Sequence, residues 1–113
     1  MASQLVSSAI ADNTVVVFSK TYCPYCVKAK ASLAQALSTL ENVSYDTAVT
    51  VVELDKRPDG PALQAAVAAK SGVRTVPQVF VGGAFVGGGD DVAALQCNGK
   101  LAKMVATAAA SRS

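Results

Sequence analysis

The residues with the most chemical potential are two cysteines separated by two residues, in the run Cys23-Pro24-Tyr25-Cys26. They follow a β-type run, Thr14 to Phe18, and precede a helix-type run, Val27 to Leu40. A thiol at a helix start faces unpaired backbone N–H groups and the positive end of the helix dipole, which favour thiolate over thiol. The spacing therefore predicts that Cys23 is a nucleophile at neutral pH. Cys26 lies on the same helical side and can form a disulfide with Cys23 after the attack.

Composition excludes several other kinds of cysteine chemistry. The chain has no His, so it cannot hold a Cys–His catalytic pair, and its three Cys fall short of the four ligands of a structural zinc site. We therefore expect a redox role for the pair and no bound metal. So few cysteines fit a reducing compartment better than a secreted disulfide scaffold, which indicates a cytoplasmic protein.

Length and charge narrow the class of protein. A chain of 113 residues is the size of one domain, so residues 1–113 are expected to share one core. Its hydrophobic content of 51% against 16% charged residues favours a folded protein over a disordered one. The net charge of +2 comes from scattered Lys and Arg, and no apolar run reaches the length of a membrane span. We expect neither a nucleic acid nor a membrane as partner.

Helices and strands are predicted to alternate around the cysteine pair. Short runs rich in Val, Thr and aromatic residues indicate strands, and apolar residues at three and four spacing indicate helices. The expected elements up to residue 72 are a short helix at Ser3 to Ala11, the strand Thr14 to Phe18, the helix Val27 to Leu40, a strand within Val43 to Asp55 that is strongest from Val49 to Leu54, and a helix from Pro61 to a stop at Gly72.

The last part of the chain predicts a hairpin and two helices. The apolar runs Gln78 to Val81 and Ala84 to Val86 flank Gly82-Gly83, which is a strong signal for a two-residue turn, so these two strands must be antiparallel. Asp90 and Asp91 are expected to supply an N-cap and a first-turn acid for a helix beginning near Val92. A final helix is expected from about Asn98 to Ala110.

This layout resembles the thioredoxin fold, in which a Cys-X-X-Cys motif follows the first strand of a βαβ pattern. The resemblance implies an α/β domain with a central four-stranded mixed sheet flanked by helices. Within that superfamily the chain is similar to dithiol glutaredoxins, which share the tetrapeptide Cys-Pro-Tyr-Cys. Further matches are Thr75-Val76-Pro77 at the family's cis-proline loop, Val86-Gly87-Gly88 followed by Asp90-Asp91 at its glycine-aspartate element, and Lys20 three residues before the first cysteine.

The resemblance implies a glutathione-dependent thiol–disulfide oxidoreductase that reduces protein–glutathione mixed disulfides and protein disulfides. Cys23 would be the nucleophile and Cys26 the resolving cysteine. Glutathione would be a co-substrate, and proteins carrying glutathione or a disulfide would be the other partners. The chain is expected to act as a monomer.

A set of glutathione-binding residues is implied as well: Lys20, Tyr25, Gln64, Val76, Pro77, Gly89 and Asp90. Lys20 and Gln64 would receive the carboxylate at the glycine end of glutathione. The extended backbone of Val76, before Pro77, would exchange hydrogen bonds with the cysteinyl unit, as an added strand does.

The γ-glutamyl end of glutathione would lie at a helix start. The N–H groups of Gly89 and Asp90 suit its carboxylate, and the Asp90 side chain suits its ammonium group. Gly89 departs from the Cys or Ser that relatives often carry, but it keeps its backbone N–H. Tyr25 would form the wall of the groove beside the sulfur.

Two other functions remain open. An iron–sulfur carrier would hold a [2Fe–2S] cluster with Cys23 of two subunits and two glutathione thiols, although Pro24 and Tyr25 stiffen and crowd the loop against such a dimer. A redox-inactive adaptor would use the fold only for contacts, and the presence of both cysteines argues against it. The third cysteine, Cys97, is expected to be a half-buried, inert thiol.

Overall fold

Strand β1 (Val15–Ser19) lies inside the sheet, and all five of its residues are buried. In the computed structural model, which describes residues 1–112, the strand order is β2-β1-β3-β4. Strand β2 (Val49–Glu53) runs parallel to β1, whereas β3 (Gln78–Val81) is antiparallel to β1 and to β4 (Ala84–Gly87). The expected four-stranded mixed sheet of a thioredoxin-like α/β fold is confirmed.

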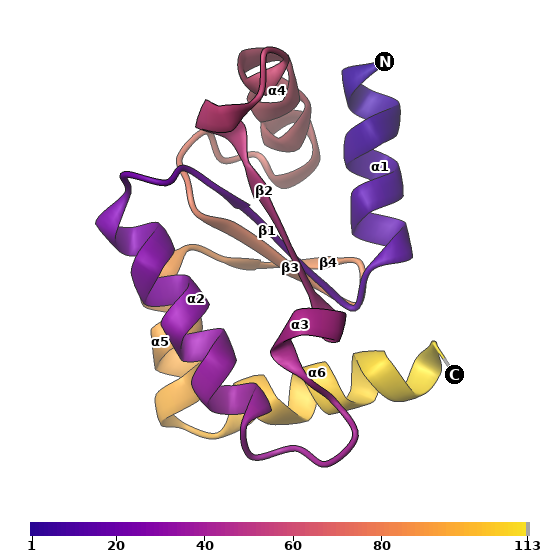
Figure 1. The fold of residues 1–113 in the computed structure, drawn as a ribbon, viewed down its shortest axis with the longest axis vertical. Coiled ribbons are helices and arrows are strands. Elements are labelled where there is room, and N and C mark those ends of the chain that lie inside the picture. The colour runs from indigo at the N-terminus through magenta and orange to yellow at the C-terminus, as the bar shows by residue number, and fades with distance from the viewer. Residues whose placement is uncertain (113) are drawn as a thin grey trace.

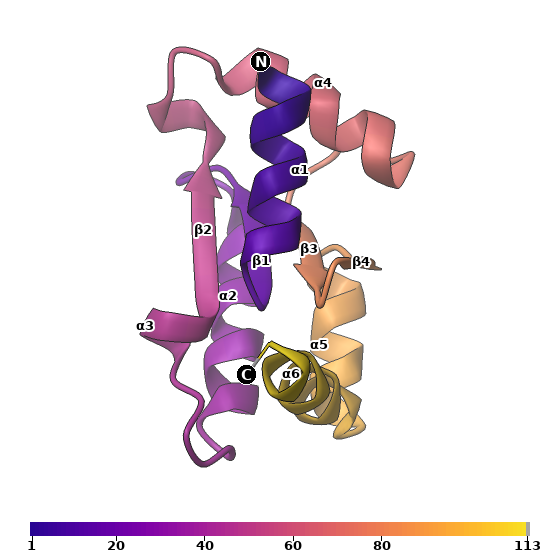
Figure 2. The ribbon, with the colours of Figure 1, turned by 90° about the vertical axis from the view of Figure 1, so that its right-hand side faces the viewer.

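Helices cover both faces of this sheet (Figures 1 and 2). One face carries α1 (Ala2–Asp12) and α4 (Gly60–Ser71), and the other carries α2 (Pro24–Leu37), α5 (Gly89–Cys97) and α6 (Lys100–Ser111). A 3-10 turn, η1 (Leu54–Lys56), joins β2 to the segment before α4. Among residues 1–112, no helix has the length and apolar character needed to cross a bilayer.

The alternation of side chains along β1 divides the core in two. Val15 and Val17 pack with Leu33 of α2 and Leu101 of α6. Val16 and Phe18 point the other way and belong to the cluster that lies under α1 and α4. Because successive side chains of a strand point to opposite faces, a run of apolar residues in β1 can anchor both helical layers.

Helix α2 begins at Pro24, directly after Cys23 as the cysteine motif predicts, and ends at Leu37, three residues before the end of the apolar run Val27 to Leu40. At the end of the helix, the hydroxyl groups of Ser38 and Thr39 donate to the carbonyl groups of Gln35 and Ala36 at 2.6 and 2.7 Å. Side chains of this kind offer the backbone an alternative to further helix, so the chain leaves the helix before Leu40.

The predicted strand within Val43 to Asp55 is wrong in its first part, where Tyr45–Ala48 form the short helix α3. Ser44 caps this helix, since its side chain accepts the Thr47 N–H at 3.4 Å. The capping signal outweighs the β preference of the residues around it. The strand begins at Val49, as the strongest part of the prediction indicated.

The helix that carries the cysteine motif is held by its buried apolar face. We predict that Leu33→Ala lowers the free energy of unfolding by about 2 to 5 kcal/mol, because the Leu33 side chain is fully buried between α2 and the sheet. Val27→Ala on the same helix is the control, since Val27 is 58% exposed and its truncation should change stability by less than about 0.5 kcal/mol. Urea unfolding of both variants measures the difference, and equal losses would contradict this account of the core.

Candidate active site

Cys23 is the N-cap residue of α2, and Pro24 begins the helix. Its sulfur accepts the backbone N–H of Cys26 at 3.3 Å, and its carbonyl oxygen accepts the N–H groups of Cys26 and Val27 at 3.1 and 3.2 Å. The side chain is half-buried, so reagents can still reach it. The sulfur therefore lies at the start of α2, where unpaired backbone N–H groups and the positive end of the helix dipole face it.

The loop before β3 lies next to this sulfur. The Val76–Pro77 peptide bond is cis, as the resemblance implied, and Pro77 is buried while Val76 is half-buried. The Cys23 thiol donates to the Val76 carbonyl oxygen at 3.8 Å. The structure therefore brings Val76 and Pro77 to the Cys23 sulfur.

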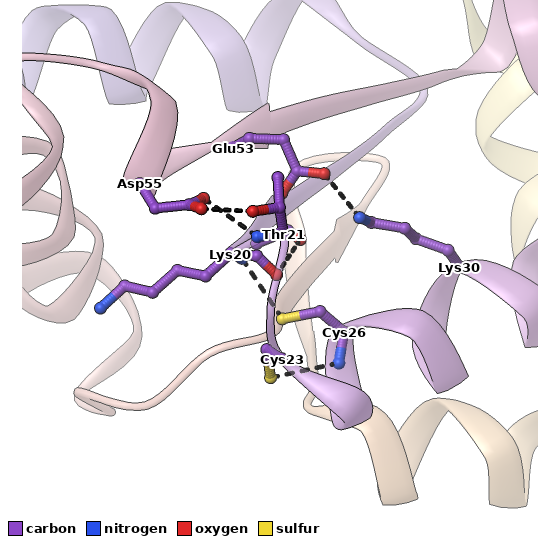
Figure 3. A network of polar contacts seen from close by, with 8 residues as sticks. Lys20, Thr21, Cys23, Cys26, Lys30, Glu53 and Asp55 are labelled. Atoms are coloured by element: carbon purple, nitrogen blue, oxygen red, sulfur yellow. Dashed lines mark hydrogen bonds and ion pairs between the residues drawn. The ribbon is translucent and has the colours of Figure 1, made fainter.

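Cys26 differs from Cys23 in its surroundings. It is fully buried one turn into α2, and its sulfur accepts the Lys20 N–H at 3.5 Å (Figure 3). Burial raises the pKa of the Cys26 thiol above its usual value, although the Lys20 N–H acts in the opposite direction. One thiol of the pair is accessible, and the other is enclosed and kept protonated.

Asp55 holds the segment between β1 and α2 in place. It accepts the Thr21 N–H at 2.9 Å on one carboxylate oxygen and the Thr21 hydroxyl on the other. These two hydrogen bonds lower the pKa of Asp55. Figure 3 shows the clamp beside the two sulfurs, with the Lys20 side chain pointing away from them.

Lys20 and Gln64 lie in one hollow, although they are distant in sequence. They line a pocket of about 300 Å³ together with Tyr22, Leu54, Asp55, Arg57, Gly60 and Pro61. The Gln64 amide nitrogen donates to the Arg74 carbonyl at 3.0 Å, which ties α4 to the loop before β3. The sequence predicts that both residues bind the same carboxylate, and the structure brings them to one pocket.

The start of α5 packs directly on the cysteine motif. A Cβ atom on Gly89 would lie 2.7 Å from the carbonyl oxygen of Tyr25, and one on Gly88 would lie 3.4 Å from the Pro77 carbonyl oxygen. Only glycine at position 89 allows the first approach without a shift of the backbone. Close packing of α5 on the backbone of Tyr25 therefore explains why position 89 carries no side chain here.

Asp90 is not the N-cap of α5, which corrects the prediction for this residue. Gly88 is the N-cap residue, and the Asp91 carboxylate reaches back to accept its N–H at 3.0 Å. The Asp90 carboxylate instead pairs with Lys28 of α2 at 2.6 Å. This first-turn position leaves Asp90 exposed at the helix start.

Lys28 is a site residue that the sequence analysis does not identify. Its ammonium group lies 6.0 Å from the centre of the Tyr25 ring, within range of a cation–π contact. The pairing with Asp90 raises the pKa of Lys28. The spacing of three residues between Tyr25 and Lys28 was a usable signal for the ring contact, whereas nothing local pointed to Asp90.

Cys97 is exposed at the end of α5, so the prediction of a half-buried thiol is wrong. This helix buries Gly89 and Val92, and Leu95 packs half-buried against the core, whereas Cys97 lies on the exposed side of the last turn. Experiments on the other two thiols therefore need Cys97 replaced.

Comparison with known proteins gives one family. The glutaredoxin family profile matches residues 15–86. Glutaredoxin-C4 of Arabidopsis thaliana is 43% identical over 103 residues, which cover 91% of this chain and 70% of the relative. Oxidized glutaredoxin 2 from Chlamydomonas reinhardtii is 46% identical, with a TM-score of 0.84 and coverage of 96% of this chain and 94% of the other.

Two other solved structures are similar over most of their length. The buckwheat glutaredoxin–glutathione complex is 38% identical with a TM-score of 0.82, covering 96% of this chain and 91% of that one. The holo form of glutaredoxin C1 from Populus tremula x tremuloides is 39% identical with a TM-score of 0.83, and the match covers 96% of this chain and 90% of that one.

The asymmetry of the two thiols predicts the order in which they are alkylated. In a Cys97→Ser background at neutral pH, iodoacetamide should modify Cys23 first, because Cys26 is buried and its raised pKa keeps it as the thiol. Modification of Cys26 should increase as the pH rises toward that pKa and the thiolate forms. Peptide mass spectrometry reads both sites, and equal modification of the two cysteines at neutral pH would contradict the assignment.

Proposed function

We propose, since the chain belongs to the glutaredoxin family of oxidoreductases, that it uses glutathione to reduce protein–glutathione mixed disulfides and protein disulfides. The observation that carries the proposal is the position of Cys23. Its half-buried sulfur accepts an N–H group at the start of α2, with the second thiol enclosed one turn further on. That arrangement suits one attacking sulfur and one resolving sulfur.

With a glutathionylated protein, one cysteine is sufficient. The Cys23 thiolate attacks the glutathione sulfur of the mixed disulfide, the protein sulfur leaves as a thiolate, and glutathione stays on Cys23. A second glutathione thiolate then attacks the sulfur of the bound glutathione, which releases oxidised glutathione and frees Cys23. Each attack exchanges one disulfide for another, so electrons pass from glutathione to the protein thiol.

With a protein disulfide, both cysteines take part. Attack by Cys23 leaves the target attached through a mixed disulfide, and Cys26 then attacks the Cys23 sulfur and releases the target in its reduced form. The Cys23–Cys26 disulfide is returned to two thiols by two molecules of glutathione. The close approach of Cys26 to Cys23 supports this step, since the Cys26 N–H already contacts the Cys23 sulfur.

The glycine end of glutathione is proposed to bind over the pocket that Lys20 and Gln64 line. The Lys20 ammonium group supplies the charge, and the Gln64 amide supplies a further hydrogen bond to the carboxylate. The cysteinyl unit then lies along the backbone of Val76 before Pro77, where the Cys23 sulfur already contacts the Val76 carbonyl.

The γ-glutamyl end is proposed to bind at the start of α5, beside Tyr25. Its carboxylate faces the N–H groups of Gly89 and Asp90, and its ammonium group faces the Asp90 carboxylate. The Lys28 ammonium group already pairs with the Asp90 carboxylate at 2.6 Å. The ammonium group of glutathione must therefore share the Asp90 carboxylate with Lys28 or displace Lys28 from it. The sequence alone did not indicate this cost to glutathione binding.

Several expectations about partners stay predictions: a monomer, a cytoplasmic location, and no resident metal. Residues 1–112 contain no group of three or more His, Cys, Asp or Glu side chains that could hold a metal ion. A cluster of the kind considered above would need two copies of Cys23 and two external thiols. Tyr25, which follows Cys23 by two residues, is 55% exposed. No step of the proposed mechanism passes through a cluster.

Replacement of each active-site cysteine separates the two pathways. We predict that Cys23→Ser abolishes both activities, whereas Cys26→Ser keeps the reduction of a small glutathione mixed disulfide and loses most reduction of a protein disulfide. A coupled assay of oxidised glutathione production measures both. Activity retained in Cys23→Ser would overturn the choice of nucleophile.

The side chain of Lys20 is predicted to act on glutathione binding. Lys20→Gln should raise the KM for glutathione about three- to tenfold at low ionic strength and leave kcat within about twofold, because Lys20 is only half-buried and a charge that water still reaches contributes modestly to binding. Lys103→Gln is the matched control, since Lys103 is an exposed cation on α6. If the two variants have the same KM, the glycine end of glutathione does not bind at Lys20.

A further inference from the structure

The buried resolving cysteine poses a problem that the mechanism above leaves unsolved. Cys26 must become a thiolate before it attacks the Cys23 sulfur, yet its sulfur is removed from water. Burial of a charge is costly unless hydrogen-bond donors replace the lost water. The groups that face the Cys26 sulfur therefore decide how readily the resolving step occurs.

One such donor is the backbone N–H of Lys20, which lies 3.5 Å from the Cys26 sulfur. The backbone that carries this N–H group is held at the next residue, because Asp55 accepts both the N–H and the hydroxyl of Thr21. Figure 3 shows this chain of contacts running from the Asp55 carboxylate through Thr21 and Lys20 to the sulfur.

Ser19 is the second candidate donor. It is the last residue of β1 and is fully buried, and it lies on the same side of the strand as Val15 and Val17, which pack against α2. Cys26 is the third residue of that helix. The hydroxyl of Ser19 lowers the pKa of the Cys26 thiol. Its hydrogen bond to the Lys20 carbonyl is 3.4 Å long, well beyond the usual O–H···O length of about 2.8 Å.

We propose that the Ser19 hydroxyl and the Lys20 N–H together stabilise the Cys26 thiolate, which makes Ser19 a residue of the resolving step. A hydroxyl that holds only a long bond to a carbonyl can rotate its hydrogen toward a negative sulfur, where the bond is charge-assisted and stronger. The inference rests on the proposed function, because the step it concerns is the one in which Cys26 resolves a mixed disulfide.

The chemistry of that step balances without a further reagent. Cys26 loses its proton to water, and its thiolate forms a bond to the Cys23 sulfur. The bond between Cys23 and the partner sulfur breaks, and the partner leaves as a thiolate that takes a proton from water. Cys26 and Cys23 are oxidised to a disulfide, and the partner sulfur is reduced. The same two donors assist the reverse direction, in which Cys26 is the leaving group.

The test measures the resolving step alone. The Cys97→Ser protein is mixed in its reduced form with glutathione disulfide, and mass spectrometry follows the glutathione adduct on Cys23 as it converts to the Cys23–Cys26 disulfide. In Ser19→Ala this conversion should slow about tenfold, as expected for the loss of a hydrogen bond to a charged group. Formation of the adduct should keep its rate within about twofold, since the Cys26 thiol takes no part in that exchange.

Ser32→Ala is the matched control, because Ser32 is also a nearly buried serine but lies further along α2. It should leave both rates unchanged. A second readout is alkylation of Cys26 in a Cys23→Ser, Cys97→Ser background at neutral pH, which Ser19→Ala should slow. Equal conversion rates in the Ser19→Ala and parent proteins, or equal slowing in Ser32→Ala, would overturn the inference. Failure of the parent protein to form any adduct would instead overturn the proposed function.

Discussion

The functional site is arranged around one contact, in which the Cys23 sulfur caps the first turn of α2. Cys23 accepts the Cys26 N–H at 3.3 Å, so a group that is usually satisfied by a Ser or Asp side chain is satisfied here by a reactive sulfur. Around this contact lie the loop with Val76 and Pro77, the start of α5 at Gly89, and the segment held by Asp55. Each of these is anchored in a different part of the chain and converges on the same helix end.

The two thiols of one motif obtain different properties from their depth. Only two residues separate them, but the Cys23 side chain is half-buried and the Cys26 side chain is fully buried. Burial raises the pKa of the Cys26 thiol. In the proposed mechanism this keeps Cys26 from competing with Cys23 for the substrate, and the difference in depth separates the attacking sulfur from the resolving sulfur.

Local patterns in the sequence were sufficient for the helix start, the hairpin and the buried strand β1, because Pro24, Gly82-Gly83 and the Val run each specify their own backbone. The helix α3 was missed because the cap at Ser44 competes with strand-forming neighbours. The pairing of Asp90 with Lys28 and of Asp55 with Thr21 joins residues that are 62 and 34 positions apart. Only the packing of the finished fold decides such contacts, so no local pattern could predict them.

The proposed function depends on activation of the Cys23 sulfur by the start of α2, and the rate of its alkylation in the folded and in the unfolded chain is the direct test. A protein that keeps Cys23 but carries Cys26→Ser and Cys97→Ser is alkylated with iodoacetamide at neutral pH, once folded and once unfolded in urea. Alkylation of Cys23 should be faster in the folded protein than in the unfolded one, although the sulfur is less exposed in the folded state. Only the folded helix presents its N–H groups to the thiolate. A folded rate equal to or below the unfolded rate would contradict it.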